Sequence, residues 1–261
     1  MSSSNTFCAI SSLYDFKSSF NFGYFKVIIC NANKAAFKPK SIVTVATGIP
    51  FGIWTIDKSE SSPSIVDDLI GNPITGINVC EAKAKQVYST DNENEYVVYY
   101  KDDATAFNGE KKAEISSKGI LNNKISTIIF EMLKENNINT HFIKSLSDRE
   151  MLVKKVEILP LEVIVRNIAA GSICKRVGLE EGVVFDEPIF EISYKNDAYG
   201  DPMLNDDYAV AMKLATREEL KFLREETLKI NELLKAFFLK LNLKLVDFKI
   251  EFGKDSEGNI I

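Results

Sequence analysis

The alternation of apolar and polar residues near the end of the chain predicts a long helix followed by a long strand. In residues 217–241 apolar side chains recur at helical spacing, and Thr216 with Glu219 forms a capping box in front of them. In residues 243–253 apolar and charged residues alternate with the period of a strand. One face of this strand would carry Val246, Phe248, Ile250 and Phe252, and the other Asp247, Lys249 and Glu251.

Shorter patterns predict the elements that come before. A strand is expected at 96–100, a core-facing helix at 118–135, and a short helix between Gly171 and Gly178. Residues 151–166 are interpreted as two strands joined at Pro160. From about Cys80 onward, predicted strands and helices follow one another closely, which indicates an α+β domain.

The first 76 residues differ from the rest. No arginine precedes Arg149, residues 1–41 are serine-rich, and residues 51–78 are broken by glycine and proline as a linker would be. We expect a poorly ordered extension outside the main core at 1–76, with lobes at 77–156 and 157–261. A targeting peptide is an alternative for residues 1–41.

Composition narrows the classes of function. The chain has 261 residues and a net charge of −5, which disfavours nucleic acid as a partner. It has no apolar run of about 18 residues, so we expect no membrane contact and a cytoplasmic protein. Its four cysteines are widely spaced and are interpreted as reduced thiols. The single histidine, His141, excludes a zinc cluster of the usual kind and is interpreted as structural.

Two segments carry candidate chemistry. Asp247, Lys249 and Glu251 would line one strand face at intervals of about 7 Å, although a solvated face with cross-strand ion pairs would look the same. In residues 159–172, Arg166 precedes Ser172 at a helix start, a combination that suits a phosphate monoester. An ordinary helix cap beside a surface arginine is the alternative there.

Three further polar stretches are weaker signals. Lys83 and Lys85 alternate beside a predicted strand and could neutralise a nucleotide triphosphate. Residues 101–105, and 195–197 with 201–203, have turn-like compositions and could be turns alone.

Taken together, these segments resemble the SAICAR synthetase family, from about Val79 to Ile261. The most specific motifs are residues 159–172 (LPLEVIVRNIAAGS) and 245–253 (LVDFKIEFG). The resemblance implies a two-lobed fold similar to ATP-grasp and kinase-like enzymes. It also implies an ATP- and Mg²⁺-dependent ligase of purine biosynthesis, which activates the carboxylate of carboxyaminoimidazole ribotide as an acyl phosphate and joins L-aspartate to it. This chemistry needs cations around phosphates and neither a cysteine nucleophile nor a histidine triad.

The resemblance also implies roles for individual residues. Lys83, Lys85 and Lys154 would bind ATP, and Glu251 would bind both ATP and the metal. Arg166, Ser172, Lys195 and Asp201 would bind substrate, while Asp247 and Lys249 would be catalytic. The lobe at 77–156 would then bind nucleotide and that at 157–261 substrate. The motifs leave the oligomeric state open, a homo-oligomer included.

Two departures from the family pattern set further expectations. Ala82 stands where the family usually has glycine. If that position needs a positive φ, or if the methyl group crowds the phosphates, the phosphate loop would be strained by about 1 kcal/mol or more. The family's second acidic metal ligand and a ribotide arginine follow the strand that begins at Ile260–Ile261 and are not among the 261 residues. We therefore expect an incomplete C-terminal lobe, an unpaired edge beside Phe248 and little ligase activity.

Because of these departures, the sequence has two other interpretations besides an active ligase. One is a non-catalytic nucleotide-binding remnant or fragment, and another is an organellar import form. Residues 41–57 also faintly resemble the end of carboxyaminoimidazole ribotide mutase, which would suggest a fused neighbouring gene.

Overall fold

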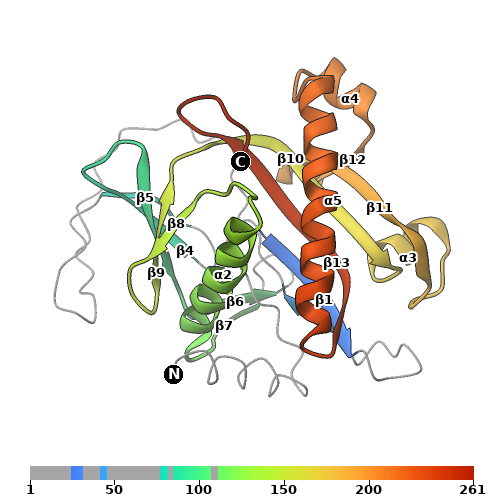
Figure 1. The fold of residues 1–261 in the computed structure, drawn as a ribbon, viewed down its shortest axis with the longest axis horizontal. Coiled ribbons are helices and arrows are strands. Elements are labelled where there is room, and N and C mark those ends of the chain that lie inside the picture. Colours follow the sequence, from blue (N-terminus) through green and yellow to red (C-terminus); the bar gives the residue numbers. More distant parts are fainter. Residues whose placement is uncertain (1–24, 32–41, 46–76, 82–84, 107–110) are drawn as a thin grey trace. The chain divides into compact units, whose positions relative to one another are not determined.

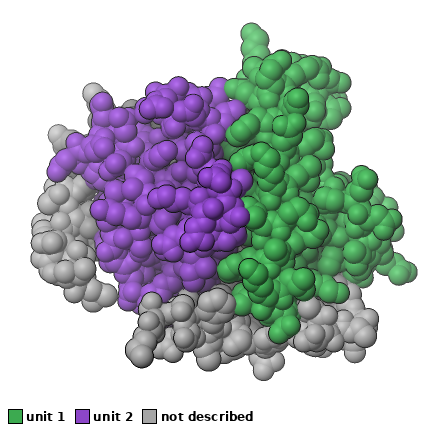
Figure 2. All heavy atoms as spheres, in the orientation of Figure 1, with its two compact units in different colours: residues 1–48, 159–252 green, residues 49–158, 253–261 purple. Residues whose placement is uncertain are grey.

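The computed structural model describes residues 25–31, 42–45, 77–81, 85–106 and 111–261. Figure 1 labels the helices and strands, and Figure 2 colours the two compact units into which the chain divides. Because each unit has a sheet and a helix of its own, they are described in turn.

Unit 2 is built on a five-stranded sheet of order β3-β4-β5-β9-β8. All of its pairings are antiparallel. Its strands are β3 (Asn78–Glu81), β4 (Lys85–Ser89), β5 (Glu95–Tyr100), β8 (Phe142–Ser145) and β9 (Glu150–Lys154). A separate hairpin joins β6 (Asp103–Ala106) to β7 (Lys111–Glu114).

Helix α2 (Lys118–Glu135) packs against strands β5 and β8 of this sheet. Its bounds match the helix predicted at 118–135, and its buried apolar residues include Ile125, Ile129 and Leu133. His141 lies just before β8 and packs edge-to-face on Phe130, with 5.0 Å between ring centroids. Burial lowers the pKa of His141 to about 3, so the ring is neutral at pH 7, as a structural histidine would be.

Unit 1 is built on a six-stranded sheet of order β12-β11-β10-β13-β1-β2. The strands are β1 (Phe25–Asn31), β2 (Ile42–Val45), β10 (Glu157–Ile168), β11 (Val184–Tyr194), β12 (Met203–Leu204) and β13 (Leu243–Lys254). The described residues of this unit also form the helices α3 (Ser172–Val177), α4 (Asp206–Ala211) and α5 (Arg217–Leu239) and a 3₁₀ turn at Asp197–Tyr199.

Helix α5 begins as predicted. The Thr216 hydroxyl accepts the Glu219 N–H at 3.1 Å, and the Glu219 carboxylate accepts the Thr216 N–H at 2.7 Å. The helix lies beside β10 and β11, because Asn231 exchanges side-chain hydrogen bonds with Asn167 and Arg224 stacks on Phe190. It ends at Leu239, two residues before the predicted end.

Two expectations about the strands were wrong. Pro160 does not separate two strands but lies inside β10, and its carbonyl accepts the Lys195 N–H at 3.0 Å. The break falls instead between β9 and β10, where the Lys155 N–H leaves the ladder and binds the Asn94 carbonyl. A proline lacks only the donor, so it can stay in a strand where no partner needs one.

The edge of β13 that was expected to be unpaired is paired with β1. The register places Phe25 opposite Ile250 and Val27 opposite Phe248. Strands β1 and β2 come from the range predicted to lie outside the main core, so that range contributes two strands to the sheet that carries the candidate site. Phe248 and Ile250 are correspondingly buried.

Candidate functional site

Four charged side chains of unit 1 form a cluster that we call the acid–ammonium cluster: Glu162, Lys195, Lys249 and Glu251. Glu162 Oε1 accepts hydrogen bonds from Lys249 Nζ at 2.5 Å and from Lys195 Nζ at 3.3 Å. Lys195 Nζ also lies 2.9 Å from Glu251 Oε1. One ammonium group therefore bridges two carboxylates, and one carboxylate oxygen serves two ammonium groups.

Strand geometry assembles this cluster from three strands. Lys249 and Glu251 are two residues apart on β13, so they share the face that the alternation predicted. Glu162 lies on β10, directly opposite Ser193 of β11, and accepts a hydrogen bond from the Ser193 hydroxyl at 3.4 Å. Lys195 follows the end of β11. The opposite face of β13 is the buried apolar one, with Val246 and Phe248 at 0% exposure.

The cluster holds most of its charges out of water. The side chains of Glu162 and Lys195 are each 6% exposed and that of Glu251 is 2% exposed. Burial alone would raise the pKa of Glu162, but the ammonium groups of Lys249 and Lys195 outweigh it and lower that pKa. Burial likewise opposes the charge of Lys195, and Glu251 and Glu162 raise its pKa nonetheless.

Glu251 is the unbalanced member of the cluster. Burial raises its pKa, and the charge of Lys195 only partly offsets this. Its Oε2 atom is buried and has no hydrogen-bond partner within the described part of the chain. A buried carboxylate oxygen without a partner is costly unless a proton or a cation satisfies it. Glu251 is therefore the group here that is best suited to bind a cation.

Among the described residues, no three acidic, cysteine or histidine side chains gather as a metal-binding group. This donor set still fits Mg²⁺, which commonly takes one or two protein carboxylates and completes its octahedron with water and substrate phosphate oxygens.

A second cluster, the arginine cluster, surrounds Arg166 on β10. Arg166 Nε donates to Glu191 at 2.7 Å, Nη1 to Asp247 at 3.2 Å and Nη2 to the Ser172 hydroxyl at 3.3 Å. The Arg166 side chain is 8% exposed, so these partners hold it in one orientation. Ser172 is exposed at the start of α3, where an anion could reach both its hydroxyl and the guanidinium.

The structure brings six of the predicted site residues into these two clusters of unit 1: Arg166, Ser172, Lys195, Asp247, Lys249 and Glu251. Asp201, also in unit 1, closes a turn by accepting the Asn196 N–H at 2.8 Å. Lys85 and Lys154 belong to unit 2. Lys85 is 1% exposed, with its ammonium 4.4 Å from the centre of the Tyr100 ring, whereas Lys154 is exposed at the end of β9. Lys83 and Ala82 lie outside the described residues.

Two acidic residues of the clusters were not predicted as site residues. They are Glu162 and Glu191. The signal for both is a charged residue inside an apolar strand, EVIVR in residues 162–166 and IFEIS in residues 189–193. Such residues are rarely buried unless they are paired.

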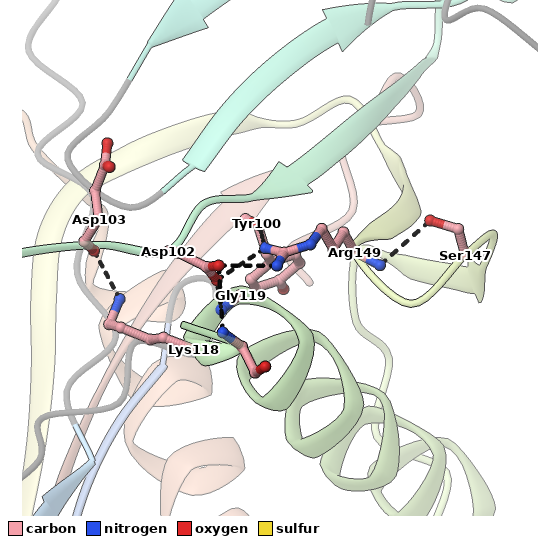
Figure 3. Close-up of polar contacts among 8 residues, drawn as sticks. Tyr100, Asp102, Asp103, Lys118, Gly119, Ser147 and Arg149 are labelled. Carbon is pink, nitrogen blue, oxygen red and sulfur yellow. Dashed lines mark hydrogen bonds and ion pairs between the residues drawn. The ribbon is translucent and has the colours of Figure 1, made fainter. Parts of the chain in front are cut away.

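Unit 2 has a polar junction of its own, drawn in Figure 3. Arg149 donates both terminal nitrogens to the Asp102 carboxylate at 2.8 Å, and Asp102 also accepts the N–H groups of Ser117 and Gly119 at the start of α2. The Arg149 hydrogen bonds are the main cause that lowers the pKa of Asp102 to about 2. Lys118 reaches the Asp103 carbonyl at 3.0 Å. This junction ties the end of β5 to the first turn of α2.

Comparison with known proteins agrees with these features. The sequence model of the SAICAR synthetase family matches residues 78–261. A phosphoribosylaminoimidazole-succinocarboxamide synthase of Finegoldia magna is 62% identical over 181 residues, which are 69% of this chain and 78% of the relative. One from a Thermoanaerobacter species is 61% identical over 181 residues, covering 69% of this chain and 77% of the relative.

Solved structures show the same likeness in three dimensions. The crystal structure of the synthase from Ehrlichia chaffeensis has a TM-score of 0.68 and 43% identity, over 70% of this chain and 79% of that one. A SAICAR synthetase solved in complex with ADP has a TM-score of 0.67 and 45% identity, over 70% and 77% of the two chains. None of the helices described here is long and apolar enough to cross a membrane. From the family match and these relatives, the chain belongs to the SAICAR synthetase family.

Proposed function

We propose that this protein is an ATP-dependent ligase that joins L-aspartate to carboxyaminoimidazole ribotide in the cytosol, with Mg²⁺ as the metal ion. Family membership and relatives named as this synthase support the reaction, and the ADP complex of a structural relative supports a nucleotide site. The observation in this chain that carries the proposal is the pairing of the acid–ammonium cluster with the arginine cluster through one face of β13.

The two clusters divide the chemistry between them. Arg166 and Ser172 bind the phosphate monoester of the ribotide. Lys195 and Lys249 neutralise charge that accumulates when the γ-phosphoryl group of ATP passes to the ribotide carboxylate. Asp247 holds Arg166 from one side at 3.2 Å and so orients it toward the ribotide. Asp201 shapes the neighbouring substrate loop, while Lys83, Lys85 and Lys154 serve the nucleotide.

The proposed reaction has two chemical steps. A ribotide carboxylate oxygen attacks the γ-phosphorus, and ADP leaves. The aspartate amine then attacks the resulting acyl phosphate at carbon, an amide bond forms, and inorganic phosphate leaves with its electron pair while the amine loses a proton. Glu251 would hold Mg²⁺, whose contribution is to offset the phosphate charge.

The test is ADP release by the full chain, measured with and without aspartate and with and without carboxyaminoimidazole ribotide. We expect release that requires both substrates, and a loss of at least about 100-fold in kcat for Lys249→Gln. Lys244→Gln is the matched control, since Lys244 lies on the same strand but is exposed. ADP release that does not depend on aspartate would show ATP hydrolysis without ligation and would contradict the proposal. Nucleotide binding without any turnover would support a non-catalytic nucleotide-binding protein instead.

A further inference from the structure

Glu191 connects two arginines in unit 1. Its Oε2 accepts the Arg166 Nε hydrogen bond at 2.7 Å, and its Oε1 accepts a hydrogen bond from Arg176 Nη2. Glu191 is directly opposite Ile164 on β10, which places it diagonally beside Arg166 on the same sheet. Its side chain is 12% exposed, so the strand and these two guanidinium groups largely enclose it.

Arg176 reaches the Glu191 carboxylate from helix α3. Ser172 and Arg176 are four residues apart on this helix and therefore lie on one face of it. Ser172 contacts Arg166, and Arg176 contacts the carboxylate that Arg166 also contacts. Both guanidinium groups contact Glu191, and the Ser172 hydroxyl contacts Arg166, so these side chains form one connected group beside α3. The Arg176 side chain is 36% exposed and remains accessible to a ligand.

Charge and hydrogen-bond capacity show why one arginine would be insufficient. Arg166 faces two carboxylates, Glu191 and Asp247, so without a second cation a phosphate dianion at Ser172 would meet net negative charge. A guanidinium has five N–H donors, and Arg166 donates three to the described residues. Arg176 brings the missing positive charge, and only one of its donors is engaged with a side chain of the described residues.

We propose that Arg176 is a second ribotide phosphate-binding residue and that Glu191 is a positioning residue that holds Arg166 and Arg176 together. This inference rests on the proposed function, whose phosphate-binding group it extends from Arg166 and Ser172 to a pair of arginines. The competing explanation is an ordinary surface ion pair between Arg176 and Glu191, which would contribute little to binding.

The first test is calorimetric titration of the full chain with ribose 5-phosphate, using ribose as the uncharged control. We expect binding of the phosphate but not of ribose. Arg176→Gln should weaken it roughly 10-fold, and Arg176→Lys should restore part of the loss because it keeps the charge. Lys175→Gln is the matched control: it removes the same charge from the neighbouring exposed position of α3 and should change binding by less than about twofold.

Glu191→Gln separates positioning from charge. If Glu191 only cancelled positive charge, removing its own charge would tighten phosphate binding; if it positions the two arginines, binding weakens although the site becomes more positive. Equal losses in Arg176→Gln and Lys175→Gln, unchanged binding in Arg176→Gln, tighter binding in Glu191→Gln, or absence of ribose 5-phosphate binding by the unaltered chain would each overturn the proposal. Unfolding curves of every variant show whether a loss reflects misfolding.

The ligase assay adds a readout that a purely structural role would not move. Arg176→Gln should raise KM for the ribotide roughly 10-fold and leave KM for ATP and kcat within about twofold. If the unaltered chain shows no aspartate-dependent ADP release, the proposed function fails, whereas the ribose 5-phosphate titration still decides on Arg176 and Glu191.

Discussion

At the scale of single residues, the buried Glu162 side chain compensates two positive charges of the acid–ammonium cluster. One of its oxygens neutralises both Lys195 and Lys249. A buried ion pair adds little net stability when it forms, but removing one partner leaves the other charge stranded. Glu162 therefore matters for folding as well as for the chemistry of its neighbours.

Glu162→Gln should lower the free energy of unfolding by about 3 kcal/mol, because it leaves two ammonium groups with less compensation in a region from which water is largely excluded. Urea denaturation measures this. Glu225→Gln is the matched control, since Glu225 pairs with Lys221 at 3.9 Å on the exposed face of α5 and should contribute no more than about 0.5 kcal/mol. Equal effects of the two substitutions would contradict the role assigned to Glu162.

Asp102 predicts a pH dependence. Its pKa in the folded protein is about 2, below the ordinary value of 3.8, so its contribution to stability is present above pH 3.8 and is lost as the pH falls toward 2. Asp102→Asn should therefore be less stable than the unaltered chain at neutral pH, and the difference should shrink between about pH 4 and pH 2. Thermal unfolding across this range measures it, and a difference that does not depend on pH would refute the ionic role of the Asp102–Arg149 pair.

Residue patterns predicted many members of the two clusters but not Glu162 and Glu191. Arg166, Ser172, Lys249 and Glu251 were predicted because their spacing is that of a strand or a helix start. Glu191 was missed because a strand of its own supplies it, and only sheet pairing brings β11 next to β10. Which residues meet across a sheet depends on register, and a single sequence shows that only indirectly.

At the scale of elements, periodicity and caps located α2, α3, α5 and β13 well, whereas α4 was not predicted. Helix α5 begins where the capping box predicts, and β13 spans Leu243–Lys254 against a prediction of 243–253. The predictions were wrong where pairing between strands, rather than the local sequence pattern, determined the structure. Pro160 was taken for a boundary although its position in β10 tolerates a missing donor, and β1 was overlooked because its partner, β13, is more than 200 residues away.

Thr216→Ala should destabilise the protein by about 1 kcal/mol, because it removes the acceptor for the Glu219 N–H at the first turn of α5. Thr216→Ser keeps the hydroxyl oxygen and should retain most of the stability. Denaturation midpoints of the two variants check this, and an alanine variant as stable as the serine variant would show that the cap contributes nothing.

At the scale of the whole molecule, the chain divides into two compact units, and each predicted site residue that the structure describes belongs to one or the other. A ligand that binds the folded chain alone must stabilise it in proportion to the logarithm of ligand concentration. ADP at 100 times its dissociation constant should therefore add about 2.7 kcal/mol to the free energy of unfolding.

This is measured as a rise in the unfolding midpoint with ADP, with adenosine as the control that lacks phosphates. If ADP leaves the midpoint unchanged at millimolar concentration, the chain binds no nucleotide in its folded state.

The double use of β13 constrains how this sequence can change. One face of the strand is a buried apolar surface and the other carries Asp247, Lys249 and Glu251, while β10 and β1 flank it on both sides. Inserting or deleting a single residue within it would turn the charged side chains toward the apolar core and the phenylalanines toward the acid–ammonium cluster. Single substitutions along β13 can therefore accumulate one at a time, whereas a change in its length would disrupt the core and the candidate site together.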